Sequence, residues 1–248
     1  MPARSIVLAA LACFLPILAA QTAKPVAASS PAAAKPDLTG QEAVIEKMAL
    51  VMRYMKDGSN VRTVTMVEHL LSDAGVRDAG VLSIPYASAT ETVTYDFVKV
   101  HKSSGEVVET PTDGTQEVPL PVTETAPMYS DLRTKQLPVK SLSVGDTLEY
   151  QVTVKDTNAD SPGVFWRVQD FTTGVPVEEE TIEVRVPREL SLLVKSKKVQ
   201  PAVTEEGGER VYRWKHETAS EYPKKQETDK TAAVNTVTLH HPCFRSSS

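Results

Sequence analysis

The stretch Leu137–Val154, LPVKSLSVGDTLEYQVTV, decides the fold class of this chain. After a turn at Gly145 and Asp146, apolar side chains alternate with polar ones, the apolar set being Leu148, Tyr150, Val152 and Val154. A period of two predicts a strand with one buried and one solvated face. Glycine suits a turn geometry that other residues resist, and an aspartate there can accept a hydrogen bond from the backbone that starts the strand. We therefore expect a tight turn that leads into a half-buried strand, Thr147–Lys155.

The same alternation recurs along the rest of the chain, between turn signals such as Asp113-Gly114, Thr173-Gly174 and Gly207-Gly208. The further segments that we predict as strands are Glu91–His101, Glu106–Glu109, Val164–Phe171, Val177–Val186, Leu190–Lys198 and Arg210–His216. Many strands without a convincing long helix are typical of sandwiches and barrels. The sequence therefore predicts an all-β fold, an antiparallel β-sandwich.

Two segments are less regular. Residues 42–55 fit both helical spacing and strand alternation, and we favour a strand from about Met48 after a short helical lead-in. Asp57-Gly58 then predicts a hairpin into a second strand, Val61–Leu71. Residues 110–142 contain five prolines, which central strands do not tolerate. We expect that segment to be an extended crossover over the sheet.

The two ends of the chain differ in composition from its middle. Arg4 precedes the apolar run Ser5–Leu18 and small residues at 19 and 20, which predicts a signal peptide over 1–20, with an uncleaved anchor as the alternative. Residues 21–40, rich in Ala, Pro and Ser, predict a disordered linker. The sandwich domain is expected over 41–217, followed by a polar tail, 218–248, that resembles the start of a linker to a missing domain. We therefore expect an exported protein, periplasmic or extracellular. It would contact the membrane only through the signal segment before cleavage.

The charge and the cysteine content of the chain argue against a nucleic-acid partner and against an internal disulfide. The 248 residues carry a net charge of −5, whereas a nucleic-acid partner requires a basic surface. Cys13 leaves with the signal peptide, so Cys243 is alone and we expect no internal disulfide. The motifs indicate no metal site and no cofactor.

A second polar cluster stands just before the opening stretch. Tyr129, Asp131 and Arg133 are two residues apart, so an extended chain would place them on one side. These residues could bind a polar ligand, or they could hold the crossover in place through local hydrogen bonds. We favour the second interpretation. Tyr150 is expected to fill the core while its hydroxyl holds this crossover, rather than to contact a ligand.

The aromatic pair Phe165-Trp166 completes the candidates. On a strand the two side chains point to opposite faces, so one enters the core and the other is free to bind a peptide, a glycan or a neighbouring domain. The candidate interaction or fold-marker residues are Tyr129, Asp131, Arg133, Gly145, Asp146, Tyr150, Phe165 and Trp166. We expect none of them to be catalytic.

Four stretches together carry a family resemblance. GEVVETPTDGTQEVP, APMYSDLRTKQLPVKSLSVGDTLEYQVTV, GVFWRVQDF and VEEETIEVRVPRELSL occur in this order. They resemble the bacterial domain of unknown function that precedes transglutaminase-like domains in exported proteins, over roughly Gln41 to His216. The resemblance implies an antiparallel β-sandwich without activity of its own, followed by a papain-like Cys-His-Asp domain.

The expected function is that of a non-catalytic exported interaction module, and not of an enzyme. Its partner would be a transglutaminase-like domain, or an envelope protein or peptide. One alternative is an envelope hydrolase that acts through carboxylates such as Asp96 and Glu149. Another is a structural envelope protein. A pocket of convergent titratable groups would favour the enzyme, and a flat exposed face would favour binding.

Overall fold

A computed structural model describes residues 38–125, 131–157, 166–190, 192–196, 199–216 and 236–240. All of these residues belong to one compact unit, 34–248. Strands dominate this part of the chain, which confirms the all-β prediction.

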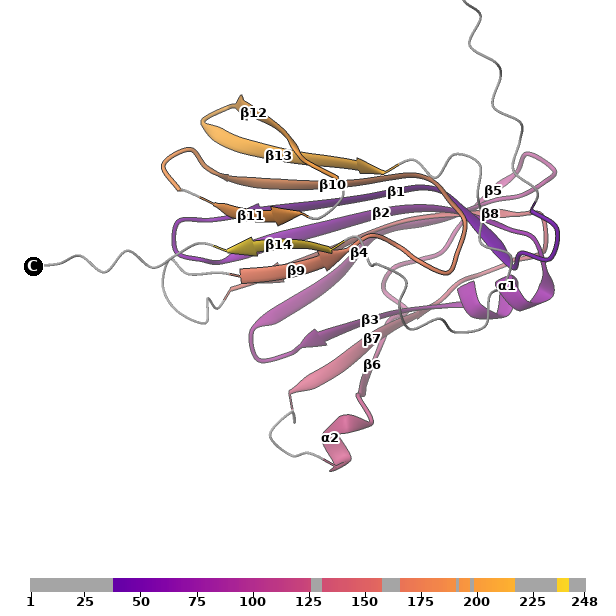
Figure 1. Ribbon diagram of the computed structural model, residues 1–248. Coiled ribbons are helices and arrows are strands. Elements are labelled where there is room, and N and C mark those ends of the chain that lie inside the picture. Colours follow the sequence, from indigo (N-terminus) through magenta and orange to yellow (C-terminus); the bar gives the residue numbers. More distant parts are fainter. Residues whose placement is uncertain are drawn as a thin grey trace, which may run out of the picture. The chain divides into compact units, whose positions relative to one another are not determined.

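The largest layer is an eight-stranded sheet in the order β12-β13-β10-β1-β2-β8-β4-β5 (Figure 1). Its strands are β1 (Ala43–Tyr54), β2 (Asn60–Leu70), β4 (Glu91–His101), β5 (Val107–Glu109), β8 (Thr147–Asp156), β10 (Val177–Pro187), β12 (Ala202–Glu206) and β13 (Glu209–His216). Neighbouring strands pair antiparallel, except that β1 and β10 run parallel.

Two three-stranded sheets and two short helices complete the described structure. One small sheet has the order β3-β7-β6, with β3 (Val81–Ala87), β6 (Gln116–Pro119) and β7 (Leu132–Pro138). The other has the order β11-β14-β9, with β9 (Trp166–Asp170), β11 (Leu193–Ser196) and β14 (Thr236–His240). The helices are α1 (Asp73–Ala79) and α2 (Val122–Thr125), and among the described residues no helix could span a membrane.

Both small sheets lie on the same side of the large sheet (Figure 1). Alternation along β8 turns Leu148, Val152 and Val154 to that side, where they are 0%, 1% and 8% exposed. The pairing continues this face across the sheet, since Val152 lies opposite Val64 on β2 and Tyr95 on β4. One core cluster fills the space toward β3-β7-β6 and a second the space toward β11-β14-β9. The opposite face of the large sheet carries mostly polar, half-exposed side chains, and we call it the open face.

The helical lead-in expected before Met48 is wrong, because β1 is a strand from Ala43 onward. Its first residues pair with β2 on one side, and from Ile45 onward it also pairs with β10 on the other. Ladder hydrogen bonds on both edges and burial of Ala43 and Ile45 outweigh the modest helical propensity of the segment. The hairpin at Asp57-Gly58 is confirmed, with Gly58 at φ 93°.

The segment expected as a plain crossover contains strands β6 and β7. Prolines are tolerated there because Pro119 ends the edge strand β6 and Pro138 ends β7. The strand β14 comes from the segment expected as a polar tail, where it pairs with β9 and β11. The Ser72 hydroxyl caps helix α1 by accepting from the Gly75 amide at 3.2 Å, and a serine at this position is a sequence signal for a helix start. The seven residues of α1 are too few for helical periodicity to show in the sequence.

The β3-β7-β6 sheet is fastened to the large sheet by Tyr95 rather than by Tyr150. The Tyr95 hydroxyl oxygen lies 3.0 Å from the Leu82 carbonyl on β3 and 2.9 Å from the Lys135 carbonyl on β7, and it can donate its proton to either. Burial raises the pKa of Tyr95, and the nearby Tyr150 adds to the effect. Tyr95, which lies near carbonyl groups of two strands, therefore has the role that the sequence suggested for Tyr150.

Removing the Tyr95 hydroxyl should destabilise the domain more than removing that of Tyr150. We expect Tyr95→Phe to lower the free energy of unfolding by about 1–3 kcal/mol, because the buried hydrogen bond of the hydroxyl to the Leu82 or the Lys135 carbonyl is lost. Tyr150→Phe is the matched control and should cost under about 0.5 kcal/mol. Urea unfolding followed by circular dichroism measures both changes. Equal losses in the two variants would contradict this assignment.

Candidate functional site

Three of the candidate residues lie wholly or partly outside the described structure. Tyr129 and Phe165 are outside the described residues, and Trp166 is described only as the first residue of the β9 backbone. Asp131 stands just before β7, where its carbonyl oxygen accepts from the Ser88 amide at 2.9 Å and from the Ser88 hydroxyl at 2.8 Å. Its contribution in the described structure is therefore a backbone contact with the turn between β3 and β4.

Arg133 lies within β7, opposite Tyr86 on β3 and Pro119 on β6. Its charge acts on Tyr86, whose pKa is raised by burial first and by Glu117 second, and lowered in part by Arg133. Among the described residues, the ion pairs do not include one between Asp131 and Arg133. The local hydrogen bonds found here are therefore those between the Asp131 carbonyl and Ser88.

Gly145 and Asp146 form the turn that immediately precedes strand β8. Gly145 has φ 84°, and its amide donates to the Leu70 carbonyl at 2.8 Å. The Asp146 carboxylate, 1% exposed, accepts from the Ser143 amide at 2.7 Å and from the Lys102 ammonium at 2.5 Å. Burial works against ionisation of Asp146, but the hydrogen bonds prevail and lower its pKa. These residues connect the turn to the β4–β5 hairpin and take no part in a cavity.

Tyr150 packs at the margin of the core cluster beside the β3-β7-β6 sheet and remains half-buried. Burial raises the pKa of Tyr150 to about 12, with a further contribution from the negative charge of Glu68. No hydrogen bond from its hydroxyl to the crossover occurs within the described residues. Its side chain therefore serves packing.

The carboxylates of the hydrolase alternative, Asp96 and Glu149, lie on the open face with separate partners. Glu149 Oε2 is 2.7 Å from His101 Nε2. Asp96 Oδ2 accepts from Gln151 Nε2 at 3.0 Å and from Thr153 Oγ1 at 2.6 Å. Because each group is engaged in its own cross-strand contact, the two do not form a convergent acid–base pair.

Short neutral side chains occupy the centre of the open face. Ala49 and Val51 on β1 adjoin Thr63 and Thr65 on β2, and all four are half-buried. Thr63 Oγ1 lies 3.3 Å from Thr153 Oγ1, and Thr65 Oγ1 donates to Gln151 Oε1 at 3.2 Å. These two rows of hydrogen bonds run from β2 across β8 and end on Asp96 of β4, which fixes the side chains in place.

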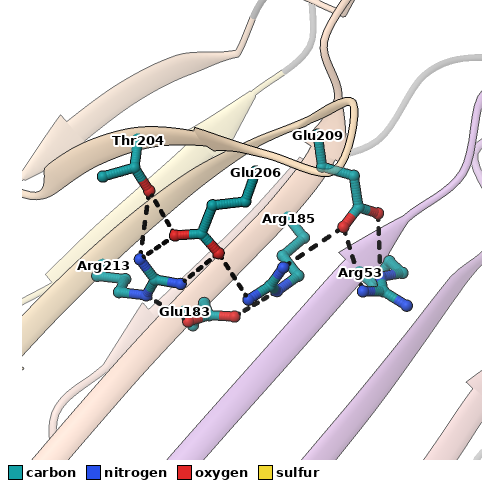
Figure 2. Close-up of polar contacts among 7 residues, drawn as sticks. All are labelled: Arg53, Glu183, Arg185, Thr204, Glu206, Glu209 and Arg213. Carbon is teal, nitrogen blue, oxygen red and sulfur yellow. Dashed lines mark hydrogen bonds and ion pairs between the residues drawn. The ribbon is translucent and has the colours of Figure 1, made fainter.

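A charged network borders this centre on the side of β10, β13 and β12. Its members, shown in Figure 2, are Arg53, Glu183, Arg185, Thr204, Glu206, Glu209 and Arg213. Arg213 forms a double contact with Glu206, at 2.7 and 2.9 Å, and a third contact with Glu183 at 2.6 Å. Hydrogen bonds from Arg213 first, and from Thr204 second, lower the pKa of Glu206 to about 2.

The network is electrically balanced and covers an apolar residue. Its three arginines face three glutamates, and Arg185 pairs with Glu183, with Glu206 at 3.3 Å and with Glu209 at 3.6 Å (Figure 2). Val211, opposite Arg185 on β13, is 0% exposed although it lies on the open face. The aliphatic stems of long charged side chains can bury such a residue while their heads pair with one another.

A cavity of about 360 Å³ lies between α1 and the loop that joins β9 to β10. Glu68 and Asp78 contribute carboxyl groups, and burial raises the pKa of Glu68, with Asp78 adding to the effect. Gly75 allows α1 to pack closely against the backbone at Glu42, since a Cβ atom at position 75 would stand 2.3 Å from the Glu42 carbonyl oxygen. The described lining includes carboxylates, which can act as general acids, general bases or nucleophiles, but no hydroxyl, thiol, imidazole or amine side chain.

Sequence reasoning did not single out Tyr95, Glu68 or the arginines of the network. Alternation placed Tyr95 correctly on a strand, but the carbonyl groups that it meets belong to strands far away in the sequence. The Gly207-Gly208 turn was a usable signal for the register of β12 and β13, which brings Glu206 near Arg213.

Comparison with solved structures shows what the fold is similar to. The crystal structure of a "putative protease" from Parabacteroides distasonis superimposes with a TM-score of 0.70 at 20% identity, covering 81% of this chain and 41% of that chain. An M1 zinc metallopeptidase from Deinococcus radiodurans matches with a TM-score of 0.42 at 11% identity, over 82% of this chain and 42% of that one. The chain thus spans less than half the length of either structure. A search of curated proteins found no match.

The sequence profile of one protein family covers most of the described structure. Residues 56–222 match DUF3857, a domain of unknown function with a solved structure. The match begins just after β1 and extends beyond β13, so it takes in the opening stretch and most strands of the large sheet. It confirms that the resemblance found in the sequence is to a domain of unknown function, and the chain belongs to the DUF3857 family.

Proposed function

We propose that this chain is a non-catalytic, exported interaction module whose open face docks on a transglutaminase-like domain. The motif resemblance supports this partner, because the domain that it points to precedes transglutaminase-like domains in exported proteins. The longer structure from Parabacteroides distasonis, described as a "putative protease", adds support, since there a similar fold makes up only part of a larger chain. Export rests on the signal-like residues 1–20 and the Ala/Pro-rich linker 21–40.

The observation that carries the proposal is the arrangement of the open face. Its centre consists of short Ala, Val and Thr side chains, and its border toward β10, β13 and β12 consists of charges that are already paired with one another. Protein interfaces combine a core depleted of charge with a polar rim. A partner that covers this face would meet no unpaired charge in the network, so the usual cost of burying an isolated charge does not arise.

A binding measurement with matched variants tests the proposal. Thr65→Arg places a long cation at the centre of the open face, while Ser83→Arg makes a comparable change at an exposed position of β3. We expect calorimetric titration with the purified transglutaminase-like domain from the source genome to show binding by the wild type and by Ser83→Arg. Thr65→Arg should weaken binding by about tenfold or more, equivalent to ~1.4 kcal/mol. Absence of wild-type binding, or equal binding by both variants, would refute the proposal.

An envelope hydrolase is the second candidate, now based on the cavity rather than on Asp96 and Glu149. The observation in its favour is Glu68, whose pKa is raised in a cavity that also contains Asp78. Purified wild type and Glu68→Gln should both be assayed on peptide and glycoside substrates. Turnover that is present in the wild type and lost in Glu68→Gln would establish the hydrolase and overturn the non-catalytic module.

A further inference from the structure

The loop of residues 171–176, between β9 and β10, forms one wall of the acidic cavity through Gly174, Val175 and Pro176. It is held at both ends. Phe171 is buried with its ring centroid 5.4 Å from that of His216, and the Pro176 carbonyl accepts from the Ile45 amide at 2.9 Å. Residues 173–175 between these anchors are exposed.

A single buried carboxylate holds the first half of this loop. The Thr172 amide donates to both oxygens of Glu180, at 3.0 and 3.1 Å, and the Thr172 hydroxyl lies 3.1 Å from Oε1. Glu180 is only 1% exposed. Within the described part of the chain, no lysine or arginine forms an ion pair with it, in contrast to Asp146, which pairs with Lys102.

Few charged groups face Glu180. On β13 the opposite residue is His216, whose charge acts on this carboxylate, and on β1 the opposite residue is Met48. The neighbouring residue on β10, Glu179, lies toward the other face of the sheet and pairs with Lys215 at 3.7 Å. Among the described side chains, the charge of Glu180 is therefore compensated by that of His216 and by the hydrogen bonds from Thr172.

We propose that Glu180 makes the 171–176 loop a pH-sensitive latch on the acidic cavity, closed in mildly acid solution and loosened as the pH rises. While Glu180 carries a proton, the site holds no buried negative charge and the loop stays anchored. When Glu180 has lost its proton, no lysine or arginine among the described residues forms an ion pair with the buried carboxylate. Local opening then lets water reach it and widens the cavity.

The direction of the effect follows from proton linkage. Burial raises the pKa of Glu180, and the bonds from Thr172 and the charge of His216 offset part of that rise. A group that holds its proton more tightly in the closed state than in the open state favours closure at low pH, and this advantage is lost as the pH rises through its closed-state pKa. The latch should therefore be tightest below the ordinary glutamate pKa of 4.5, and it should loosen as the pH rises above that value.

Hydrogen exchange of the Thr172 amide, followed by NMR and corrected for the intrinsic rate, tests the latch. Between pH 5 and 8 we expect its protection in the wild type to fall about tenfold for each unit by which closure raises the pKa of Glu180. Glu180→Gln retains an acceptor oxygen and cannot ionise, so protection should be independent of pH. Glu179→Gln makes the same charge change at the exposed neighbour and should behave as the wild type does.

The Val64 amide on β2 serves as an internal reference for global unfolding. If Glu180→Gln does not fold, the pH profile of protection in the wild type still tests the proposal. A latch requires the Thr172 amide to lose protection as the pH rises while the Val64 amide keeps its protection. A Thr172 profile that is flat in the wild type, that parallels Val64, or that falls equally in Glu180→Gln overturns the proposal.

Discussion

Asp146→Ala is expected to lower the free energy of unfolding by about 3–5 kcal/mol, in the range for breaking a buried charge pair. The carboxylate is 1% exposed and joins three parts of the chain, accepting from the Ser143 amide, from Lys102 and, at 3.4 Å, from the Ser103 amide. Alanine removes all three bonds and leaves the Lys102 ammonium, itself only 21% exposed, without its carboxylate. Urea unfolding at neutral pH measures the loss.

The pH dependence of the same residue supplies a control. The pKa of Asp146 is lowered by folding, so its stabilising contribution is present above the unfolded-state pKa of 3.8 and disappears as the pH falls through the lower folded-state pKa. The stability difference between wild type and Asp146→Ala should therefore be constant near neutrality and shrink only in strong acid. A difference under about 1 kcal/mol at neutral pH would show that the turn does not depend on this carboxylate.

Trp214→Ala is expected to cost about 3–5 kcal/mol, the range for truncating a large buried aromatic side chain. Trp214 on β13 is 0% exposed and stacks on Tyr212, with ring centroids 6.2 Å apart. It belongs to the core cluster beneath the β11-β14-β9 sheet. Its indole nitrogen has no hydrogen-bond partner among the described residues, so the expected loss is one of packing.

Val203→Ala on the adjacent strand β12 is the matched control for the tryptophan. Val203 lies opposite Tyr212 and is 52% exposed, so its truncation should change the free energy of unfolding by no more than about 0.5 kcal/mol. Both variants are compared by urea unfolding. A Trp214→Ala protein as stable as the Val203→Ala protein would mean that this cluster is not a core.

The fold was predictable where one strand carries its own signal. Strands β4 and β8 match their predicted bounds within a residue, because each is a long run of alternating side chains between clear turns. In β4 a bulge between Tyr95 and Phe97 shifts the buried set to Val98 and Val100, which alternation alone does not predict. The helical lead-in before Met48 and the plain crossover were wrong for the same reason. Short segments there gain their strand structure from neighbours distant in the sequence, and local propensity is too weak to reveal this.

The candidate site was less predictable than the fold. Tyr95 and Tyr150 both lie on the covered face and look alike in the sequence, yet only Tyr95 meets the carbonyl groups of Leu82 and Lys135. The balance of charge on the open face depends on the register between β10 and β13, two strands separated by other elements. Alternation identifies which residues share a face, but long-range pairing decides which of them touch.

Methyl NMR of the labelled chain, titrated with the transglutaminase-like domain from the source genome, tests the central claim most directly. We expect the signals of Ala49, Val51 and Thr65 on the open face to shift as the complex forms. Those of Leu148 and Val152 on the covered face should stay in place. Shifts confined to other surfaces, or no shifts at saturating concentrations of the domain, would contradict the claim that the open face is where this module binds its partner.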